Sequence, residues 1–212
     1  MPFPFFILQM LLCGQEAILP CRNQKNIVKF SSTIKMKSLD IWKEGNLFMT
    51  KAQYERLSKP YQNSRFKRRA LVAADKLITM LVFFSYPVFL IYMGVTHSPQ
   101  EFGRAVIIPA VSFLLVSVFR KWYSAPRPYE VLDIKPILVK DTKGKSFPSR
   151  HVFSVFVIGM ACFYTVKLLG AAICLLGMIL ACIRVIGGVH FPKDVIAGAL
   201  LGIAAGLFFW IS

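Results

Sequence analysis

The sequence predicts an all-α protein, a polytopic transmembrane helical bundle of about five spans with an N-terminal amphipathic, basic helical segment. Of its 212 residues, 56% are hydrophobic, which is more than an ordinary soluble domain contains. Between residues 152 and 212, charge is confined to Lys167, Arg184, Lys193 and Asp194. The helices of this stretch therefore have no polar face to meet water, which argues against a soluble bundle.

Residues 1–35 are the first predicted segment. Its opening, Met1–Cys13, is apolar but has neither a basic n-region nor a clear cleavage site, so it is a poor signal peptide and is too short to span a membrane. Two interpretations remain open. Residues 1–35 are a leader, or translation starts at Met36 and they are a misannotated start.

Residues 36–69 are the second segment, predicted to be a basic amphipathic region in the cytoplasm or at the membrane interface. Across the wider stretch 22–69, Lys, Arg, Gln and Asn are mixed with scattered apolar residues such as Trp42 and Tyr54. This pattern is typical of a helical hairpin or an interfacial amphipathic helix.

Residues 70–212 are predicted to be the membrane-embedded domain. They contain apolar runs at about 77–95, 105–119, 152–166, 171–186 and 195–211. Several runs are shorter than the roughly 20 residues that a bilayer requires, but flanking cations can snorkel and a tight bundle can thin the bilayer. In the last run, the four-residue spacing of Gly198, Gly202 and Gly206 predicts close contact with another helix.

The charge of the chain indicates its binding partners, and the positions of the cysteines indicate whether disulfides form. The formal charge of +16 comes from 26 Lys and Arg against 10 Asp and Glu. The cations lie beside apolar runs and no groove-reading motif is present, so we expect anionic lipid headgroups and phosphorylated substrates, and no nucleic acid. Of the five cysteines, Cys162, Cys174 and Cys182 lie inside apolar runs and are expected to pack rather than to form disulfides.

Polar residues gather in three clusters between the runs, at Arg120–Arg127, at Ser146–His151 and at Arg184–Asp194. The first two are joined by a polar loop. The next two runs form a hairpin that returns the chain to its starting face. All three clusters are therefore expected on one side of the membrane.

The third cluster is centred on a histidine and an aspartate. Pro192 suits the first turn of the last helix, so His190 lies just before that helix and Asp194 lies in its first turn. An aspartate that accepts the proton of one ring nitrogen leaves the other nitrogen free to act as nucleophile or base. By itself, this pair could equally be a structural hydrogen bond.

The remaining polar residues suit a phosphoryl group. Arg184 ends one helix before the Gly187-Gly188 turn, Ser149 and His151 begin another, and Arg120, Lys121 and Arg127 flank a proline turn. Taken singly, they are ordinary helix-end cations and caps. Together they supply the fixed cations that a transferring phosphoryl group needs. One histidine can act as the nucleophile and the other as the acid that protonates the leaving group.

The three clusters resemble the signature of the type 2 phosphatidic acid phosphatase and vanadium haloperoxidase superfamily, Lys-x6-Arg-Pro, Pro-Ser-Gly-His and Ser-Arg-x5-His-x3-Asp. The resemblance covers about residues 70–212 and implies a membrane phosphatase domain. It implies that His190 forms a phosphohistidine, Asp194 orients it and His151 protonates the leaving oxygen. It also implies that Arg120, Arg127, Ser149 and Arg184 hold the phosphate, with no metal or cofactor.

The sequence departs from that signature at three positions, with Arg120 for lysine, Arg150 for glycine and Ile183 for serine. Arg120 keeps the charge, although Lys121 could take its role. The Arg150 side chain must point away from the site or contact the substrate. Ile183 removes one hydrogen bond.

The expected function is hydrolysis of a lipid phosphate or diphosphate such as phosphatidate, phosphatidylglycerol phosphate or undecaprenyl diphosphate. Three alternatives are weighed against it. His151, His190 and Asp194 could bind a metal, but nearby arginines would repel it. The cationic pocket could serve a non-enzymatic lipid-binding or transport protein. A soluble haloperoxidase is disfavoured by the spans.

The protein is expected in the cell membrane as a multi-pass protein. The cations outside the three clusters favour a cytoplasmic active face by the positive-inside rule. Similar enzymes, however, often work on the outer face.

Overall fold

The computed structural model describes residues 49–139 and 142–211, which belong to one compact unit. Every regular element among them is a helix, and four of the helices are long and apolar enough to cross a membrane. The predicted fold class is therefore confirmed. The expectations for residues 1–35, and for residues 36–48 of the segment 36–69, lie outside the described residues.

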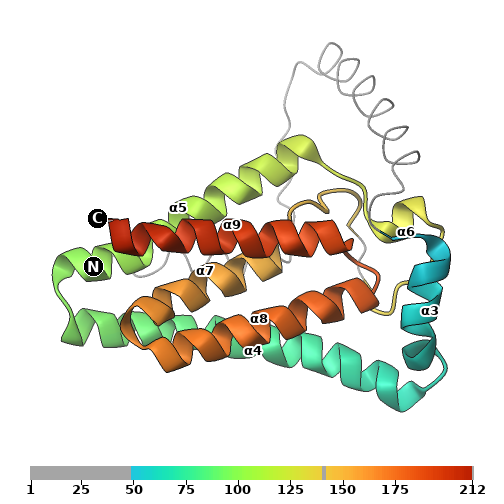
Figure 1. Ribbon diagram of the computed structural model, residues 1–212, viewed down its shortest axis with the longest axis horizontal. Helices are drawn as coiled ribbons and strands as arrows, with labels where there is room; N and C mark the ends of the chain where they lie inside the picture. The colour runs from blue at the N-terminus through green and yellow to red at the C-terminus, as the bar shows by residue number, and fades with distance from the viewer. Residues whose placement is uncertain (1–48, 140–141, 212) are drawn as a thin grey trace, which may run out of the picture. The chain divides into compact units, whose positions relative to one another are not determined.

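The helices follow one another with short connections, except for one longer loop between α6 and α7 (Figure 1). Their bounds are α3 Lys51–Gln62, α4 Arg65–Thr96, α5 Pro99–Tyr123, α6 Pro128–Val131, α7 Arg150–Thr165, α8 Lys167–Ile186 and α9 Pro192–Ile211.

Local sequence signals explain where several helices begin. Thr50 caps α3 and Ser98 caps α5, each in a capping box completed by the residue three positions later. Ser64 caps α4, which is why this helix begins at Arg65, well before the apolar run at 77–95. The first turns of α4 are therefore polar and precede its apolar run.

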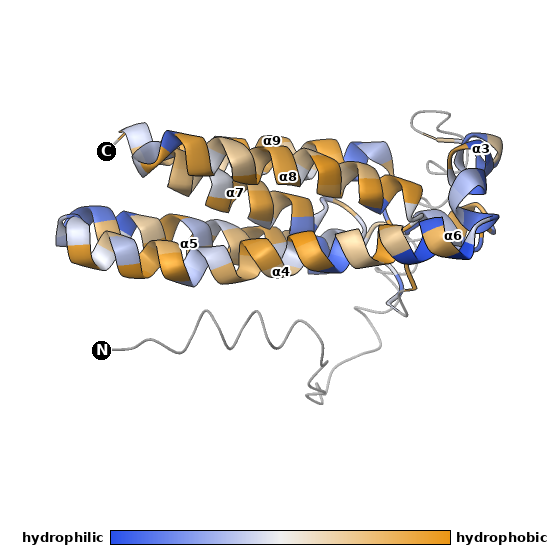
Figure 2. Ribbon diagram, turned by 90° about the horizontal axis from the view of Figure 1, so that it is seen from below, coloured by the Kyte–Doolittle hydropathy of each residue, from blue (hydrophilic) through white to orange (hydrophobic). Residues whose placement is uncertain are grey.

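The shortest of the apolar helices, α7, is the central one. It packs most extensively against α8 and α9 and also contacts α4 and α5. Most of its residues are buried, whereas the longer helices expose large apolar side chains such as Val88, Ile107 and Leu115. The hydropathy colouring shows that the ribbons of the long helices are largely hydrophobic along their length (Figure 2). An outer surface of this kind suits lipid, and α7 is covered by protein instead.

The predicted close contact of the last helix is confirmed. Gly198, Gly202 and Gly206 of α9 are all buried and face α7. A Cβ atom added at Gly202 would lie 2.7 Å from the Phe153 carbonyl oxygen, and one at Gly198 would lie 2.6 Å from that of Ser149. Because no side chain separates the two backbones, the beginning of α9 lies directly against the beginning of α7.

One end of the bundle gathers the chain segments that carry the polar clusters. Here α5 and α8 end, α7 and α9 begin, and α3 and α6 lie nearby, while the other end of α9 lies at the far end of the bundle (Figure 1). Segments that are distant in sequence thus meet at this end.

Candidate active site

His190 and Asp194 lie side by side at the beginning of α9, both almost fully buried. The His190 Nδ1 atom is 3.5 Å from Asp194 Oδ2. The same carboxylate oxygen accepts hydrogen bonds from the Ser146 hydroxyl and from the Phe191 backbone N–H, the latter at 3.0 Å. Ser146 Oγ also lies 3.4 Å from His190 Nδ1. The contacts fix the Nδ1 edge of the ring and leave Nε2 on its opposite side.

The surroundings of His190 favour its neutral form. Burial, together with the charges of Arg127 and Arg120, lowers the pKa of His190 to about 3, against the opposing influence of Asp194. At neutral pH the ring is therefore an uncharged imidazole. An uncharged ring whose Nδ1 proton faces Asp194 carries its lone pair on Nε2.

The beginning of α7 is tied to the same place. The Ser149 backbone N–H donates to the Asp194 carbonyl oxygen at 2.8 Å. The Ser149 hydroxyl is buried, makes no capping hydrogen bond and has no partner among the described residues. His151 follows in the first turn of α7 and is half-buried. Ser149 thus offers a hydroxyl donor within a buried polar cluster.

Of the two neighbouring cations at the end of α5, only Arg120 turns inward. It is 7% exposed, and its guanidinium donates to the carbonyl oxygens of Ser146, at 3.3 Å, of Pro148 and of Lys145. Lys121 is exposed. Arg120 therefore braces the loop that carries Ser146 and Ser149, and Lys121 lies apart from it.

Arg127 connects that loop to the turn that carries His190. Its Nε donates to the Gly144 carbonyl oxygen at 3.0 Å, and its Nη1 donates to the Val189 carbonyl oxygen at 3.0 Å. A longer contact of 3.5 Å joins Nη2 to the Lys145 carbonyl oxygen. Because a guanidinium has more N–H donors than these contacts use, Arg127 retains donors for a further acceptor.

The other two arginines of the clusters have partners that the sequence did not indicate. Arg184, 6% exposed, has its Nε 2.8 Å from Asp75 Oδ1 on α4. The Arg150 guanidinium lies over the Phe113 ring of α5, 5.5 Å from its centroid, which is a cation–π contact. The Arg150 side chain is thus directed toward α5.

Sequence reasoning missed three residues of this region: Asp75, Glu130 and Ser146. Glu130 accepts from the backbone N–H groups of Arg127, at 2.7 Å, and of Gly144, at 2.9 Å, and so holds the loop ends together. Ser146 lies within the second cluster, but its contact with Asp194 is invisible in sequence because 48 positions separate the two. The one signal for Asp75 is that it is the only acidic residue in α4.

No group of three or more His, Cys, Asp or Glu side chains suited to a metal ion occurs in the stretches 49–139 and 142–211. The site there consists of a histidine and aspartate pair, two serine hydroxyls and several arginines. This donor set is suited to an anion, because guanidinium groups and hydroxyls donate to phosphate oxygens.

The fold and the site together define a multi-pass helical membrane protein with a buried histidine and an arginine cluster at one end of the bundle. The PAP2 superfamily model matches residues 102–212, more than half of the chain, and the chain belongs to this superfamily. The predicted membership of this superfamily is thereby confirmed.

Relatives and solved structures agree with this assignment. The chain is 36% identical over 107 residues to the bacitracin transport permease protein BcrC of Bacillus licheniformis, a match that covers 50% of this chain and 53% of that relative. The crystal structure of Aquifex aeolicus LpxE matches with a TM-score of 0.62 and 21% identity, over 80% of this chain and 99% of LpxE.

A PAP2-type phosphatidylglycerolphosphate phosphatase from Bacillus subtilis also matches, with a TM-score of 0.62 and 18% identity, over 85% of this chain and 93% of that one. At these identities, the two structures establish the shared fold. The chain spans about half the length of the curated relative that it matches.

Proposed function

We propose that the protein hydrolyses a phosphate monoester or diphosphate of a membrane lipid through a phosphohistidine intermediate. The observation that carries this proposal is the buried, neutral His190, whose Nδ1 faces Asp194 and Ser146 beside a set of arginines. A neutral imidazole held by a carboxylate is an activated nucleophile, and the arginines supply charge for the phosphoryl oxygens.

In the first step, His190 Nε2 attacks phosphorus and the bond from phosphorus to the lipid oxygen breaks. His151, at the beginning of α7, donates a proton to that oxygen, so the lipid leaves as an alcohol, or as a monophosphate if the substrate is a diphosphate. Asp194 stabilises the positive charge that develops on the His190 ring. Arg120, Arg127, Arg184 and Ser149 hold the phosphoryl oxygens.

In the second step, water attacks the phosphohistidine. His151, now without its proton, takes one from this water, and the bond between Nε2 and phosphorus breaks. Inorganic phosphate leaves and His190 returns to its neutral form. The two steps use no group outside the chain apart from substrate and water.

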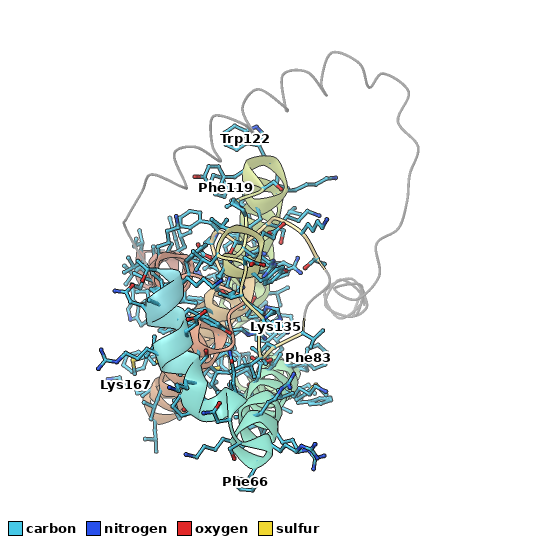
Figure 3. The ribbon with its side chains drawn as sticks, turned by 90° about the vertical axis from the view of Figure 1, so that its right-hand side faces the viewer. Phe66, Phe83, Phe119, Trp122, Lys135 and Lys167 are labelled. Carbon is cyan, nitrogen blue, oxygen red and sulfur yellow. The ribbon has the colours of Figure 1, made fainter. Side chains whose placement is uncertain are left out.

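Aromatic residues at this end of the bundle support a lipid substrate. Trp122 is 80% exposed at the end of α5, and Figure 3, which views this end, shows Trp122 and Phe119 at one edge. Phe119 and Tyr123 pack edge-on against Phe147, with ring centroids 6.4 Å and 5.9 Å apart. Exposed aromatics of this kind favour the membrane interface. A headgroup can therefore enter the site while its tail stays in hydrocarbon.

Phosphatidate, phosphatidylglycerol phosphate and undecaprenyl diphosphate are the substrates to test. The Bacillus subtilis neighbour is named as a phosphatidylglycerolphosphate phosphatase, which makes phosphatidylglycerol phosphate one reasonable first choice. The common chemical feature is a phosphate on a lipid too apolar to leave the bilayer.

The test is phosphate release by the purified protein in lipid nanodiscs, supplied with each of the three lipids. We expect steady release from at least one lipid in the parent and its loss in His190→Ala. His97→Ala is the matched control, because His97 lies at the opposite end of the bundle, after α4, and should retain parent activity. A radiolabelled phosphoryl group should remain on the parent after acid-free quenching and be absent from His190→Ala.

Lipid binding without turnover would contradict the enzymatic proposal and favour a lipid-binding or transport protein. Turnover that a chelator abolishes and zinc or iron restores would contradict the metal-independent mechanism. Turnover that persists in His190→Ala would exclude the phosphohistidine.

A further inference from the structure

Arg184 and Asp75 form an ion pair between two helices. Arg184 lies in the last turn of α8 and Asp75 lies in the first third of α4. The Nε and Oδ1 atoms are 2.8 Å apart, and the two side chains are only 8% and 14% exposed. Among the described residues, Asp75 is the ion-pair partner of Arg184.

Asp75 is an unusual residue for its place in α4. α4 is a candidate membrane span and Asp75 is its only acidic residue. Asp75 precedes the apolar run at 77–95, but its side chain is only 14% exposed, and a buried charge is costly unless it is paired. Asp75 faces one of the arginines of the third motif, and the charge of each offsets the cost of burying the other.

The contact leaves part of the guanidinium for another anion. Asp75 approaches the Nε side of Arg184, and the terminal Nη1 and Nη2 groups can donate to two phosphate oxygens at once. Without a partner, an arginine at a helix end has many rotamers. A carboxylate at Nε restricts the direction in which the terminal groups point.

The ion pair also lies beside the turn that carries His190. The Val189 backbone N–H donates to the Arg184 carbonyl oxygen at 3.3 Å, and the Val189 carbonyl oxygen accepts from Arg127 Nη1. The backbone of Arg184 and the side chain of Arg127 therefore both contact the residue that precedes His190.

We propose that Asp75 is a positioning residue, which holds the Arg184 guanidinium so that its terminal N–H groups face the phosphate. The proposal rests on the proposed function, because it assumes that the site binds a phosphate. It adds a residue from α4, upstream of residues 102–212, to which the superfamily model matches. None of the three motifs contains it.

The experiment compares Asp75→Ala, Asp75→Asn and Asp75→Glu with the parent in nanodiscs. Two quantities are measured: KM for the lipid phosphate, and the binding constant of inorganic phosphate from its stabilisation against heat. We expect Asp75→Ala to weaken both by about 10-fold or more, the size seen for residues that orient metal-ligating side chains. Asp75→Asn, which keeps the shape and one acceptor oxygen, should lie between the parent and Asp75→Ala, and Asp75→Glu should recover most of the loss.

Two controls separate positioning from general damage. Thr79→Ala changes the next turn of α4, where the Thr79 hydroxyl donates to the Asp75 carbonyl oxygen at 2.7 Å, and should behave as the parent. In an Arg184→Ala background, Asp75→Ala should cause no further loss, because its effect passes through Arg184.

A folded Asp75→Ala or Asp75→Asn protein with the parent's KM and phosphate affinity would overturn the proposal. So would an equal loss from Asp75→Ala with and without Arg184. If the parent releases no phosphate from any lipid, the proposed function fails, while the binding of inorganic phosphate still decides the role of Asp75. A parent that neither binds nor releases phosphate overturns both.

Discussion

His190 is enclosed on every side, at 1% exposure, and this burial determines its chemistry. A histidine in water is half protonated near pH 6.5. Here burial in a site that also holds Arg120 and Arg127 disfavours a further positive charge, and the pKa falls to about 3. The proposed nucleophile is thus ready to react at neutral and mildly acidic pH.

This pKa can be measured directly. The chain contains three histidines, so His97→Gln combined with His151→Gln leaves His190 as the only one. We expect the carbon-13 resonances of its labelled ring to stay at their neutral-form positions from pH 8 down to about pH 5, because the folded-state pKa lies well below that range. A titration centred near pH 6.5 would contradict the burial of a neutral ring.

The same pKa difference affects stability. The unfolded chain takes up a proton on His190 near pH 6.5, whereas the folded protein takes it up only near pH 3. Between these values the unfolded state binds more protons, so His190 makes the folded state less stable as the pH falls through this window. The wild-type histidine should therefore make the protein more acid-sensitive than His190→Gln.

At the scale of single elements, α3 packs on the turn between α8 and α9. Tyr54 of α3 is 1% exposed, and its hydroxyl donates to the Lys135 carbonyl oxygen at 3.3 Å. Its ring covers Gly188, which has a φ angle of +76°. The Ile137 and Leu138 backbone N–H groups also donate to the Gly187 carbonyl oxygen, at 3.0 Å and 3.2 Å. The turn before His190 is thus held by α3 and by the loop after α6.

Gly188→Ala should disturb this arrangement. The added Cβ would lie 2.6 Å from the Tyr54 hydroxyl oxygen, and a left-handed backbone costs an L-residue about 1–2 kcal/mol. We expect a lower unfolding temperature and a lower kcat, because the displaced turn carries His190.

Gly103→Ala is the matched control for this prediction. Its Cβ would meet no atom within 4 Å, and alanine favours a helix over glycine by about 0.5–1 kcal/mol. Gly103→Ala should therefore be as stable as the parent or slightly more stable. A Gly188→Ala protein that melts at the parent temperature would show that α3 does not constrain the turn.

At the scale of the whole molecule, sequence patterns predicted the features that depend on local composition and on the order of the helices. Apolar runs predicted the membrane helices, proline and glycine predicted the turn around His190, and helix parity predicted that the clusters share an end. Contacts that depend on packing could not be predicted in this way. The pairing of Asp75 with Arg184 requires α4 to lie beside α8, and the bond from Ser146 to Asp194 requires the loop conformation that Arg120 and Glu130 hold.

The distribution of charge between the two ends of the bundle predicts the orientation of the protein. The end with the site has many exposed cations outside the motifs, namely Lys51, Arg56, Lys59, Arg65, Lys67, Arg68, Arg69 and Lys76. The opposite end, where α5 and α8 begin, has Arg104 and Lys167. By the positive-inside rule, we expect the site to face the cytoplasm.

Cysteine labelling in intact cells tests this orientation. Lys143→Cys lies in the exposed loop before α7, and Gln100→Cys lies in the exposed first turn of α5, at the other end of the bundle. Each is introduced into a protein whose own five cysteines are replaced by serine or alanine. A membrane-impermeant maleimide should label Gln100→Cys in intact cells and Lys143→Cys only after permeabilisation. The reverse pattern would place the site on the outer face. Labelling of both positions in intact cells would contradict the membrane-spanning arrangement of α5.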